Sequence, residues 1–169
     1  VKGANYLEAL NKVETIVFDK TGTLTRGVFK VTEINPANDS TAEELLKYAA
    51  YAESYSNHPI ALSILEAYNA DLDNKLIENY QELAGNGTRI NFNRQEILAG
   101  NSRLMERENI SYNRPSSPGT AVHVAIDKKY AGHIVIADAI KDDSARAIRE
   151  IKSLGVKKTI MLTGDIKPI

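Results

Sequence analysis

Residues 19–25 read Asp-Lys-Thr-Gly-Thr-Leu-Thr and combine one carboxylate with threonine hydroxyls and a glycine. They follow directly on the apolar residues 16–18, which predict a short, fully buried strand. Aspartate is one of the side chains that form covalent intermediates, and free backbone N–H groups in a turn bind anions. An ordinary turn after a strand would need only the glycine. We therefore interpret Asp19 as a nucleophile that accepts a phosphoryl group.

A second candidate group, Thr163-Gly164-Asp165, follows the apolar residues 159–162. By itself this tripeptide is more typical of a simple turn than of a site. Its setting favours a function, because ligands bind at the carboxyl ends of the strands in an open parallel sheet. If both apolar segments are strands of one such sheet, their ends bring Asp19 and Thr163 together.

Three short patterns between these segments are candidates for a ligand pocket. His58 precedes a proline, and a histidine next to a helix start is more often a cap or a surface residue than a ligand. Gly85 and Gly87 flank one asparagine; such a pair is commonly a turn, although two glycines also let the backbone approach a ligand closely. Gly100 and Asn101 follow an apolar run, and Asn101 is also a candidate helix N-cap.

The elements that must position these residues belong to two kinds of structure. The first and last segments read as strand-then-loop and helix-then-strand pieces of an α/β unit, whereas the middle reads as an α+β insertion. Strands are expected at 16–18, 27–34, 121–126, 130–137 and 159–162, with further strands and turns between 79 and 100. Helices are expected to begin at Ser40 or Thr41, at Pro59, at Asn101 or Ser102 and at Asp142 or Asp143.

The composition excludes several classes of protein. The chain has 169 residues and a formal net charge of -1, so it lacks the excess of positive charge that favours binding to nucleic acid. It has no cysteine, so disulfides and thiolate metal sites are excluded. His58, His123 and His133 show no metal-ligand spacing, and we assign the last two to ordinary strand or surface positions. No apolar run approaches the roughly 20 residues that cross a bilayer, and no signal peptide is visible, so we expect a soluble, monomeric chain.

The segment 19–25 matches, over all seven positions, the phosphorylation motif of the P-type ATPases, which are ion pumps built on the haloacid-dehalogenase fold. The resemblance implies that Asp19 takes the γ-phosphate of ATP and forms an aspartyl-phosphate. It also implies that Thr23 contacts the phosphate and that Thr21, through its backbone carbonyl, binds Mg2+ together with Asp19. Magnesium takes only one or two carboxylates and keeps several waters, so a site built from loop oxygens is chemically reasonable.

Residues 157–165 resemble the corresponding later stretch of the same pumps. By this resemblance Thr163 and Gly164 hold phosphate oxygens, and Asp165 lines the nucleotide and Mg2+ region. The resulting fold prediction is a partial haloacid-dehalogenase-like, Rossmann-like phosphorylation domain with an inserted α+β nucleotide-binding domain, an antiparallel sheet flanked by helices. The predicted boundaries are 1–26 and 138–169 for the first domain and 27–137 for the second.

The middle of the chain resembles the heavy-metal-transporting branch of this family. The pattern Ser-Asn-His-Pro at 56–59 is similar to the branch signature, in which the histidine, here His58, helps to hold ATP. Glu53 matches a position that contacts the adenine. The same ATP pocket is completed in that branch by a Gly-x-Gly loop and a Gly-Asn pair, which correspond here to Gly85, Gly87, Gly100 and Asn101. Residues 2–8 and 157–162 look closer to zinc/cadmium pumps than to copper pumps, although copper stays possible because the metal is chosen in membrane segments.

The chain departs from the family pattern in ways that affect the expected activity. Ala84 stands where proline is frequent, and Ile166 follows Asp165 where asparagine is usual. The chain starts without a methionine, and a later Gly-Asp-Gly segment that would complete the Mg2+ site is absent, so we interpret it as a piece of a longer protein. We expect it to bind ATP but to phosphorylate Asp19 poorly or not at all. Its expected partners are ATP and the rest of its own chain: membrane helices, an actuator domain and the remaining phosphorylation domain.

Two other functions compete with that of a cytoplasmic domain of a pump in the cell membrane. One is a soluble phosphatase of the haloacid-dehalogenase type. Such enzymes usually carry a second aspartate two residues after the nucleophile, and this position is Thr21 here, which would make hydrolysis of a phospho-enzyme slow. A long-lived intermediate suits a pump, because the protein changes shape while the intermediate persists. The other alternative is a non-catalytic nucleotide-binding module.

Overall fold

A computed structural model of the protein describes residues 12–162, which divide into two compact units. The first unit combines residues 1–28 with residues 138–169, and the second unit is residues 29–137. Strands β2 (Thr25–Pro36) and β7 (Lys129–Ile140) each contribute residues to both units. The second unit is therefore an insertion in the first.

The second unit is built on a six-stranded sheet with the order β2-β7-β6-β5-β4-β3. The neighbours from β3 to β7 pair in antiparallel fashion. The β6–β7 pairing confirms the hairpin predicted on either side of residues 127–129. The remaining strands of the sheet are β3 (Ile77–Leu83), β4 (Gly87–Phe92), β5 (Gln95–Gly100) and β6 (Thr120–Ile126), with a short 3-10 turn η2 (Asn74–Leu76) before β3.

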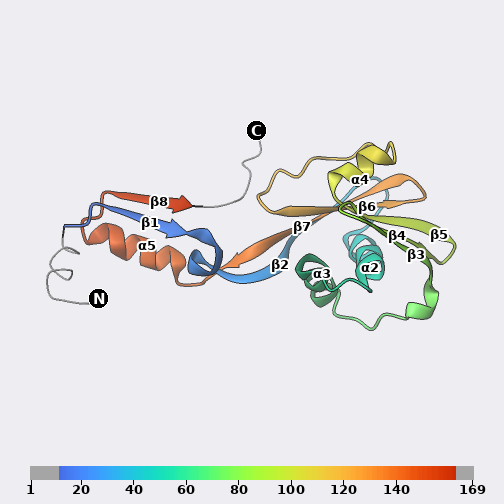
Figure 1. The fold of residues 1–169 in the computed structure, drawn as a ribbon, viewed down its shortest axis with the longest axis horizontal. Coiled ribbons are helices and arrows are strands. Elements are labelled where there is room, and N and C mark those ends of the chain that lie inside the picture. Colours follow the sequence, from blue (N-terminus) through green and yellow to red (C-terminus); the bar gives the residue numbers. More distant parts are fainter. Residues whose placement is uncertain (1–11, 163–169) are drawn as a thin grey trace. The chain divides into compact units, whose positions relative to one another are not determined.

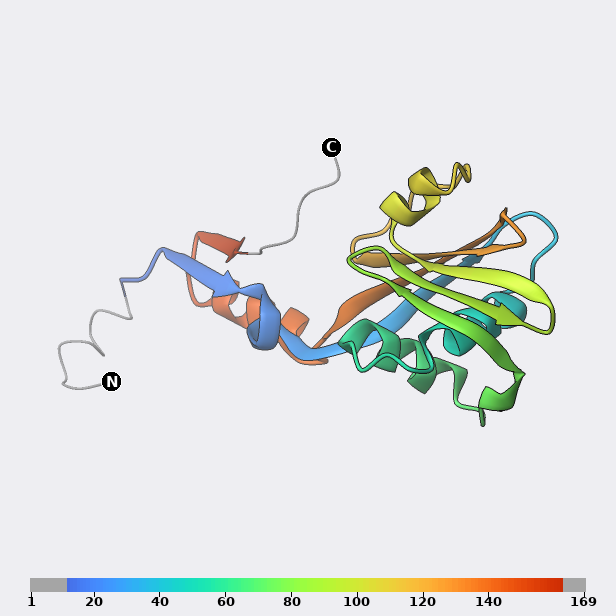
Figure 2. The ribbon, with the colours of Figure 1, turned by 45° about the vertical axis from the view of Figure 1, so that its right-hand side comes forward.

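Helices cover both faces of this sheet. Helices α2 (Ala42–Glu53) and α3 (Pro59–Tyr68) lie against one face, and α4 (Ser102–Arg107) lies against the other (Figures 1 and 2). Their first residues follow the predicted signals. The Thr41 hydroxyl accepts a hydrogen bond from the Glu44 N–H while the Glu44 carboxylate accepts one from the Thr41 N–H, which is a complete capping box. Pro59 is the first residue of α3, where its missing N–H costs nothing.

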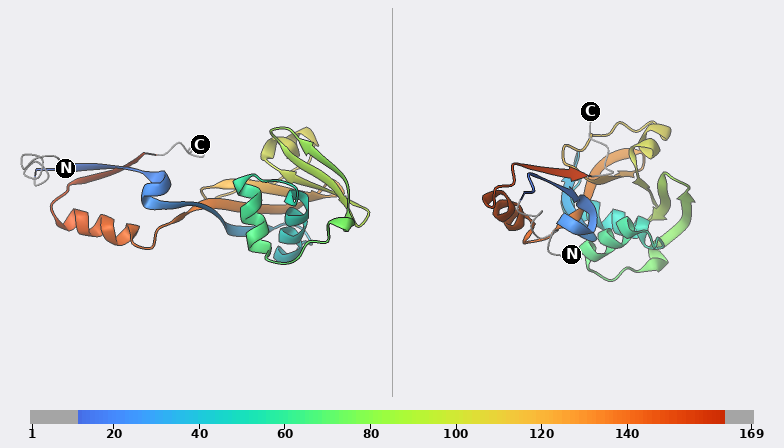
Figure 3. Two further views of the ribbon diagram at one scale, coloured as in Figure 1. Left: turned by 60° about the horizontal axis from the view of Figure 1, so that its bottom comes forward. Right: turned by 60° about the vertical axis from the view of Figure 1, so that its left-hand side comes forward.

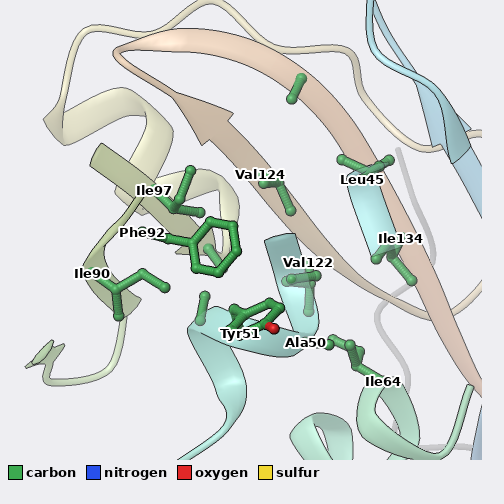
Figure 4. Packing of buried hydrophobic residues seen from close by; sticks show 14 of the residues in the cluster. Leu45, Ala50, Tyr51, Ile64, Ile90, Phe92, Ile97, Val122, Val124 and Ile134 are labelled. Carbon is green, nitrogen blue, oxygen red and sulfur yellow. The ribbon is translucent and has the colours of Figure 1, made fainter. Parts of the chain in front are cut away.

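The main core lies between the sheet and the pair α2–α3 (Figure 4). Leu45 and Ile64 project from the two helices and are fully buried. Phe92 of β4 is 2% exposed, and its ring centroid lies 4.2 Å from that of Tyr51 on α2. Truncating a buried aromatic side chain to alanine costs about 3–5 kcal/mol, so this contact is a major part of what fixes α2 on the sheet.

The described residues of the first unit include no buried hydrophobic side chain. Strands β1 (Thr15–Asp19) and β8 (Lys158–Leu162) pair in parallel, and α5 (Ser144–Ser153) lies beside the pair (Figures 1 and 3). Both strands were predicted to be fully buried, and this prediction is wrong: Val17 is 52% exposed and Met161 is 51% exposed. The reason is that, among the described residues, each strand has only the other strand and one helix as neighbours.

None of the helices in residues 12–162 is long and apolar enough to cross a membrane.

The sheet face that carries α4 contains a buried chain of hydrogen bonds that the sequence did not reveal. The Asn35 amide nitrogen lies 3.3 Å from both a Glu33 carboxylate oxygen and His133 Nε2. Because this nitrogen donates, Nδ1 of His133 must carry the ring proton, and it donates to the Tyr130 hydroxyl at 3.1 Å. That hydroxyl then donates to Nδ1 of His123 at 3.0 Å. Both histidines are buried rather than at ordinary surface positions.

Burial of His123 and His133 makes the second unit less stable at low pH. Desolvation lowers the pKa of His123 to about 4 and also lowers the pKa of His133. A histidine in the unfolded chain has a pKa of about 6.5. Below that pH the unfolded state therefore binds protons that the folded state does not, and stability falls as the pH drops from about 6.5 towards 4, by up to about 3 kcal/mol for His123.

We predict that the variant His123→Asn reduces this acid sensitivity. Asparagine offers a polar atom near the Nδ1 position but does not titrate, so the variant should be less stable than the wild type at pH 7 while losing less stability between pH 7 and pH 4.5. Urea unfolding at both pH values measures the two differences. A variant with the wild-type pH dependence would contradict the assignment of the acid sensitivity to His123.

Candidate functional site

Asp19 is the last residue of β1, and its side chain is exposed. In the parallel pairing it lies opposite Leu162, the last residue of β8. The residue that follows Leu162 is the first of the predicted group 163–165, which lies outside the described residues. The register therefore ends both strands at the same edge, as the sequence predicted for strands 16–18 and 159–162.

The predicted loop residues follow in a single turn, η1 (Lys20–Leu24). Thr21 and Thr23 are exposed, as Asp19 is. Gly22 has φ of +76°, a left-handed conformation that glycine adopts without steric cost. Its N–H donates to the Thr25 hydroxyl at 3.1 Å, which closes the turn. The turn thus presents a carboxylate and two threonines on one exposed segment.

Residues from the end of β7 to the start of α5 fix this turn. The Thr25 hydroxyl donates to a carboxylate oxygen of Asp138 at 2.5 Å. Lys141 Nζ donates to the Gly22 carbonyl at 2.8 Å, and the Ser144 hydroxyl donates to the Leu24 carbonyl at 2.7 Å. The Lys141 side chain is therefore bonded to the turn that follows Asp19.

The sequence did not predict which residues hold the turn, because no sequence pattern marks the partner of Thr25. Thr25 was visible as the last position of the 19–25 pattern, but nothing in the sequence named its partner Asp138, which follows 113 positions later. The Asp138 carboxylate also accepts from the Val28 N–H at 3.1 Å. One buried hydroxyl and one carboxylate therefore join the segment that leaves β1 to the segment that leads into α5.

In the second unit, His58 is the N-cap residue of α3. Its Nδ1 accepts a hydrogen bond from the Ile60 N–H at 3.2 Å, and its own N–H donates to the Ser56 hydroxyl at 3.3 Å. The interpretation of His58 as a helix cap is therefore correct, but capping engages only Nδ1 of the imidazole ring. With Nδ1 occupied as an acceptor, the neutral ring carries its proton on Nε2. The exposed side chain can donate that proton to a ligand.

Glu53 is the last residue of α2 and is 9% exposed. The Ser56 N–H donates to its backbone carbonyl at 3.0 Å, so residues 53–58 form a compact link between α2 and α3. Burial raises the pKa of the Glu53 carboxyl to about 7; the Ser56 hydroxyl opposes this shift, and the negative charge of Glu82 adds to it. Glu82 belongs to β3.

The glycines occupy the adjacent turn and strand ends. Leu83 pairs with Gly87, and Gly87 pairs with Gly100. A side chain on Gly87 would place its Cβ 2.1 Å from the Ala99 carbonyl oxygen, and one on Gly100 would meet the Asn86 carbonyl oxygen at 2.1 Å. These two glycines are therefore required by the close approach of β4 and β5 themselves. The sequence had left open whether the glycine pair serves a turn or the close approach of a ligand.

Gly85 differs from the other two glycines. It has φ of +70°, and a Cβ at this position would meet no atom within 4 Å. Asn101 closes the turn: its side-chain amide donates to the Gly85 carbonyl at 2.8 Å, while its Oδ1 accepts from the Leu104 N–H at the start of α4. Asn101 is thus the predicted helix cap, and it also fixes the glycine turn. The open space beside Gly85 is the part of the turn that a ligand can approach.

The site residues fall into two sets, one in each unit. In the first unit, Asp19 ends β1 and is followed by the turn that contains Thr21 and Thr23. In the second unit, strand pairing and the Asn101 side chain join the glycine turn to the end of β5, whereas Glu53 and His58 lie on the link between α2 and α3. A groove of about 740 Å³, lined by residues 37–39, 109–113 and 128–130, contains none of the predicted residues.

A family model described as haloacid dehalogenase-like hydrolase matches residues 13–169, and the chain belongs to that family. A cadmium, zinc and cobalt-transporting ATPase of Bacillus subtilis (strain 168) is 57% identical over 167 residues, which are 99% of this chain and 24% of the relative. The chain thus spans about a quarter of the length of the curated relatives that it matches.

Solved structures of metal pumps share the fold. The crystal structure of a zinc-transporting PIB-type ATPase in the E2.Pi state matches with a TM-score of 0.78 and 33% identity, over 99% of this chain and 28% of the other. The catalytic domain of the CPx-ATPase CopB-B, described in connection with conformational changes upon nucleotide binding, matches with a TM-score of 0.65 and 26% identity, over 99% of this chain and 60% of the other. Together with the sequence match, these similarities confirm the resemblance to heavy-metal P-type ATPases.

The different roles of the glycines lead to a prediction about stability. Gly85→Ala should cost about 1 kcal/mol, because only the left-handed backbone conformation is penalised. Gly100→Ala and Gly87→Ala should each cost about 3 kcal/mol or more, because the new methyl group overlaps the neighbouring backbone and, at Gly87, the positive φ adds a further penalty. Urea unfolding of the three variants measures the order. Equal losses for Gly85→Ala and Gly87→Ala would contradict the backbone-contact explanation.

The contacts around Thr25 lead to a second prediction. Thr25→Val keeps the shape of the side chain but removes the acceptor for the Gly22 N–H and the donor to Asp138. Because a hydrogen bond to a charged group contributes about 1.5–3 kcal/mol, amide hydrogen exchange at Gly22 should become at least about tenfold faster. Thr23→Val is the matched control, since the Thr23 side chain is exposed in the same turn. Equal exchange at Gly22 in the two variants would show that Thr25 does not hold the turn.

Proposed function

We propose that this chain is the ATP-binding part of a heavy-metal-transporting P-type ATPase, with nucleotide bound by the second unit and phosphate accepted by Asp19. The observation that carries the proposal is the Asp19 turn: an exposed carboxylate at the carboxyl end of a parallel strand, on a turn fixed by Thr25, Asp138 and Lys141. A nucleophile for phosphoryl transfer must be accessible and held in a defined direction. The similarity to metal pumps over nearly the whole chain supports the same conclusion.

In the proposed reaction a carboxylate oxygen of Asp19 attacks the γ-phosphorus of ATP, the bond to the β,γ-bridging oxygen breaks, and ADP leaves. Catalysis of such a transfer consists mainly of positioning and of charge neutralisation. Thr21 and Thr23, which lie in the turn that follows Asp19, are proposed to contact the transferred group. Thr163, Gly164 and Asp165 are proposed to complete the phosphate site, since they follow the strand whose last residue lies opposite Asp19.

The oxygen donors of the Asp19 turn suit magnesium. Mg2+ prefers oxygen ligands and takes one or two carboxylates with several waters, and the Asp19 carboxylate and the Thr21 carbonyl provide such donors. The described residues contain no cluster of three or more carboxylate or histidine side chains, so an ion here would depend on water, on the phosphates and on residues such as Asp165. When bound, Mg2+ would neutralise charge on the transferred phosphoryl group.

The second set of residues is proposed to bind the nucleotide. His58 offers an Nε2–H donor and an exposed ring face, Glu53 offers a buried carboxyl, and Gly85 leaves open space beside the backbone. Gly87, Gly100 and Asn101 act less directly, because they fix the shape of the turn. The description of conformational changes in the CopB-B catalytic domain upon nucleotide binding supports a nucleotide site within this fold.

The proposed cargo is a divalent heavy metal, with zinc or cadmium favoured because the Bacillus subtilis relative is named for cadmium, zinc and cobalt. We propose that the chain works in the cytoplasm as part of a membrane protein, with the rest of its own chain as partner. The rival function, a soluble phosphatase, is compatible with the hydrolase family. However, this chain has threonine at position 21, where such a phosphatase would carry its acid/base aspartate.

The nucleotide role of His58 can be separated from its capping role. Asparagine is among the best N-cap residues, so His58→Asn should keep α3 intact while removing the imidazole Nε2–H. We predict about tenfold weaker ATP binding for this variant by isothermal titration calorimetry, which corresponds to the loss of about 1.4 kcal/mol. His58→Ala should weaken binding similarly and should also lower the unfolding free energy by about 1 kcal/mol. Wild-type affinity in His58→Asn would remove the imidazole from the proposed site.

A further inference from the structure

Three buried polar side chains converge on one point in the sheet face that carries α4. His123 and His133 are direct partners in the pairing of β6 with β7, so their side chains stand on the same face. Tyr130 lies three residues before His133, and in a regular strand this odd spacing would place it on the opposite face. The pairing shifts register after Val124, and this β-bulge turns the Tyr130 side chain to the two histidines.

The polar atoms of these side chains have the spacing of ligand atoms around one metal ion. Nδ1 of His123 and Nδ1 of His133 lie 3.0 Å and 3.1 Å from the Tyr130 hydroxyl oxygen. Zinc binds nitrogen and oxygen at about 2.0–2.2 Å in a tetrahedron, so two of its ligand atoms lie about 3.3 Å apart. The two imidazole centroids are 5.6 Å apart, and two imidazoles on one such ion would be separated by about 5 Å. Small side-chain shifts would therefore bring all three atoms onto one ion.

The three side chains are buried, but they lie beside the groove of about 740 Å³. His123, His133 and Tyr130 are 2%, 7% and 7% exposed. Tyr130 lines the groove, and so does Tyr112, whose ring packs edge-on against His123 with centroids 4.9 Å apart. The groove therefore gives an ion a route to the three side chains. It also leaves the fourth position of a tetrahedral ion to water or to a group of the groove wall.

The residues behind His133 suit a histidine that binds a metal through Nδ1. Coordination there moves the ring proton of His133 to Nε2, which lies 3.3 Å from the Asn35 amide group. Asn35 in turn lies 3.3 Å from a Glu33 carboxylate oxygen, so amide and carboxylate oxygens are available on this side. A metal-bound histidine usually donates its other ring N–H to such an oxygen. The Tyr130 hydroxyl gives its proton to water when it binds the ion, so binding releases one proton.

We propose that His123, His133 and Tyr130 form a site for a divalent transition metal, and that Zn2+ matches its two imidazole nitrogens and one phenolate oxygen. Imidazole suits zinc, whereas Mg2+ prefers carboxylate, carbonyl and water oxygens, so the site is different in kind from the one proposed at Asp19. It lies within the second unit and does not depend on the proposed nucleotide site. Because an ion that binds only the folded chain stabilises it, the stability of the second unit should rise with the zinc concentration.

The sequence did not predict this site, because His123 and His133 are ten positions apart and have no spacing typical of a metal motif. They become neighbours only through the pairing of β6 with β7. The sequence has no cysteine and only one other histidine, His58. A zinc titration therefore has few competing nitrogen or sulfur ligands to distinguish.

The experiment titrates the whole chain with Zn2+ alone by isothermal titration calorimetry. Tyr130→Phe keeps the ring but removes one ligand atom, and its zinc affinity should be at least about tenfold lower than that of the wild type. Tyr112→Phe is the matched control, because the Tyr112 hydroxyl donates to Glu106 and not to the histidines. Its zinc affinity should equal that of the wild type, and so should that of His58→Asn, which removes the exposed histidine.

Nitrogen-15 NMR of the histidine rings tests the same inference without any variant. On addition of Zn2+ to the wild type, the Nδ1 signals of His123 and His133 should shift together, and the Tm should rise. This measurement decides the question even if Tyr130→Phe fails to fold. Absence of zinc binding, ring shifts confined to His58, or wild-type zinc affinity in a folded Tyr130→Phe would each overturn the inference.

Discussion

The placement of the residues proposed to bind nucleotide depends on the packing of α2 and α3 against one face of the six-stranded sheet. Leu45, Tyr51 and Ile64 make this contact with Phe92 and its neighbours, and they are all buried. Because the last turn of α2 is held on the sheet, the Glu53 side chain is buried. The same packing fixes the short link that ends at His58. The chemistry proposed for the second unit is thus a consequence of an apolar core that contains none of the residues proposed to bind nucleotide.

The backbone contact between β4 and β5 is the second constraint on this site. Gly87 and Gly100 lie so close that neither tolerates a Cβ, and the turn before them is tied to Asn101. The first unit uses a different device. There the turn that follows Asp19 is held by hydrogen bonds to Asp138, Lys141 and Ser144, while the strands stay largely exposed. The close β4–β5 contact in the second unit and the hydrogen-bonded turn in the first unit each limit the directions from which a ligand can approach.

Features encoded by neighbouring residues could be predicted from the sequence. The capping box at Thr41, the proline that starts α3 and the asparagine that starts α4 are local signals, and the structure confirms each of them. The hairpin of β6 and β7 was predictable for the same reason. The Asp19 turn was recognised because seven consecutive residues match a known pattern, and the comparisons confirm the resemblance.

Features that depend on distant residues were not predictable. Short apolar strands were expected to be buried, but burial depends on what packs against them, and Val17 has too few neighbours. The role of Lys141 depends on the Gly22 carbonyl, and the burial of His123 and His133 depends on Tyr130 between them. A sequence also cannot distinguish a glycine required by another strand from one required by a ligand, which is why Gly87 and Gly85 were given the same role.

The most direct test of the central claim is a backbone amide NMR titration of the whole chain with a non-hydrolysable ATP analogue and Mg2+. The account predicts that the largest shift changes fall on residues 53–58, on residues 85–87 and at Asn101, the residues that surround the end of α2 and the glycine turn. Shift changes confined to the turn after Asp19, or no changes in residues 29–137, would contradict an inserted nucleotide site and would favour a phosphatase that binds its substrate at Asp19 alone.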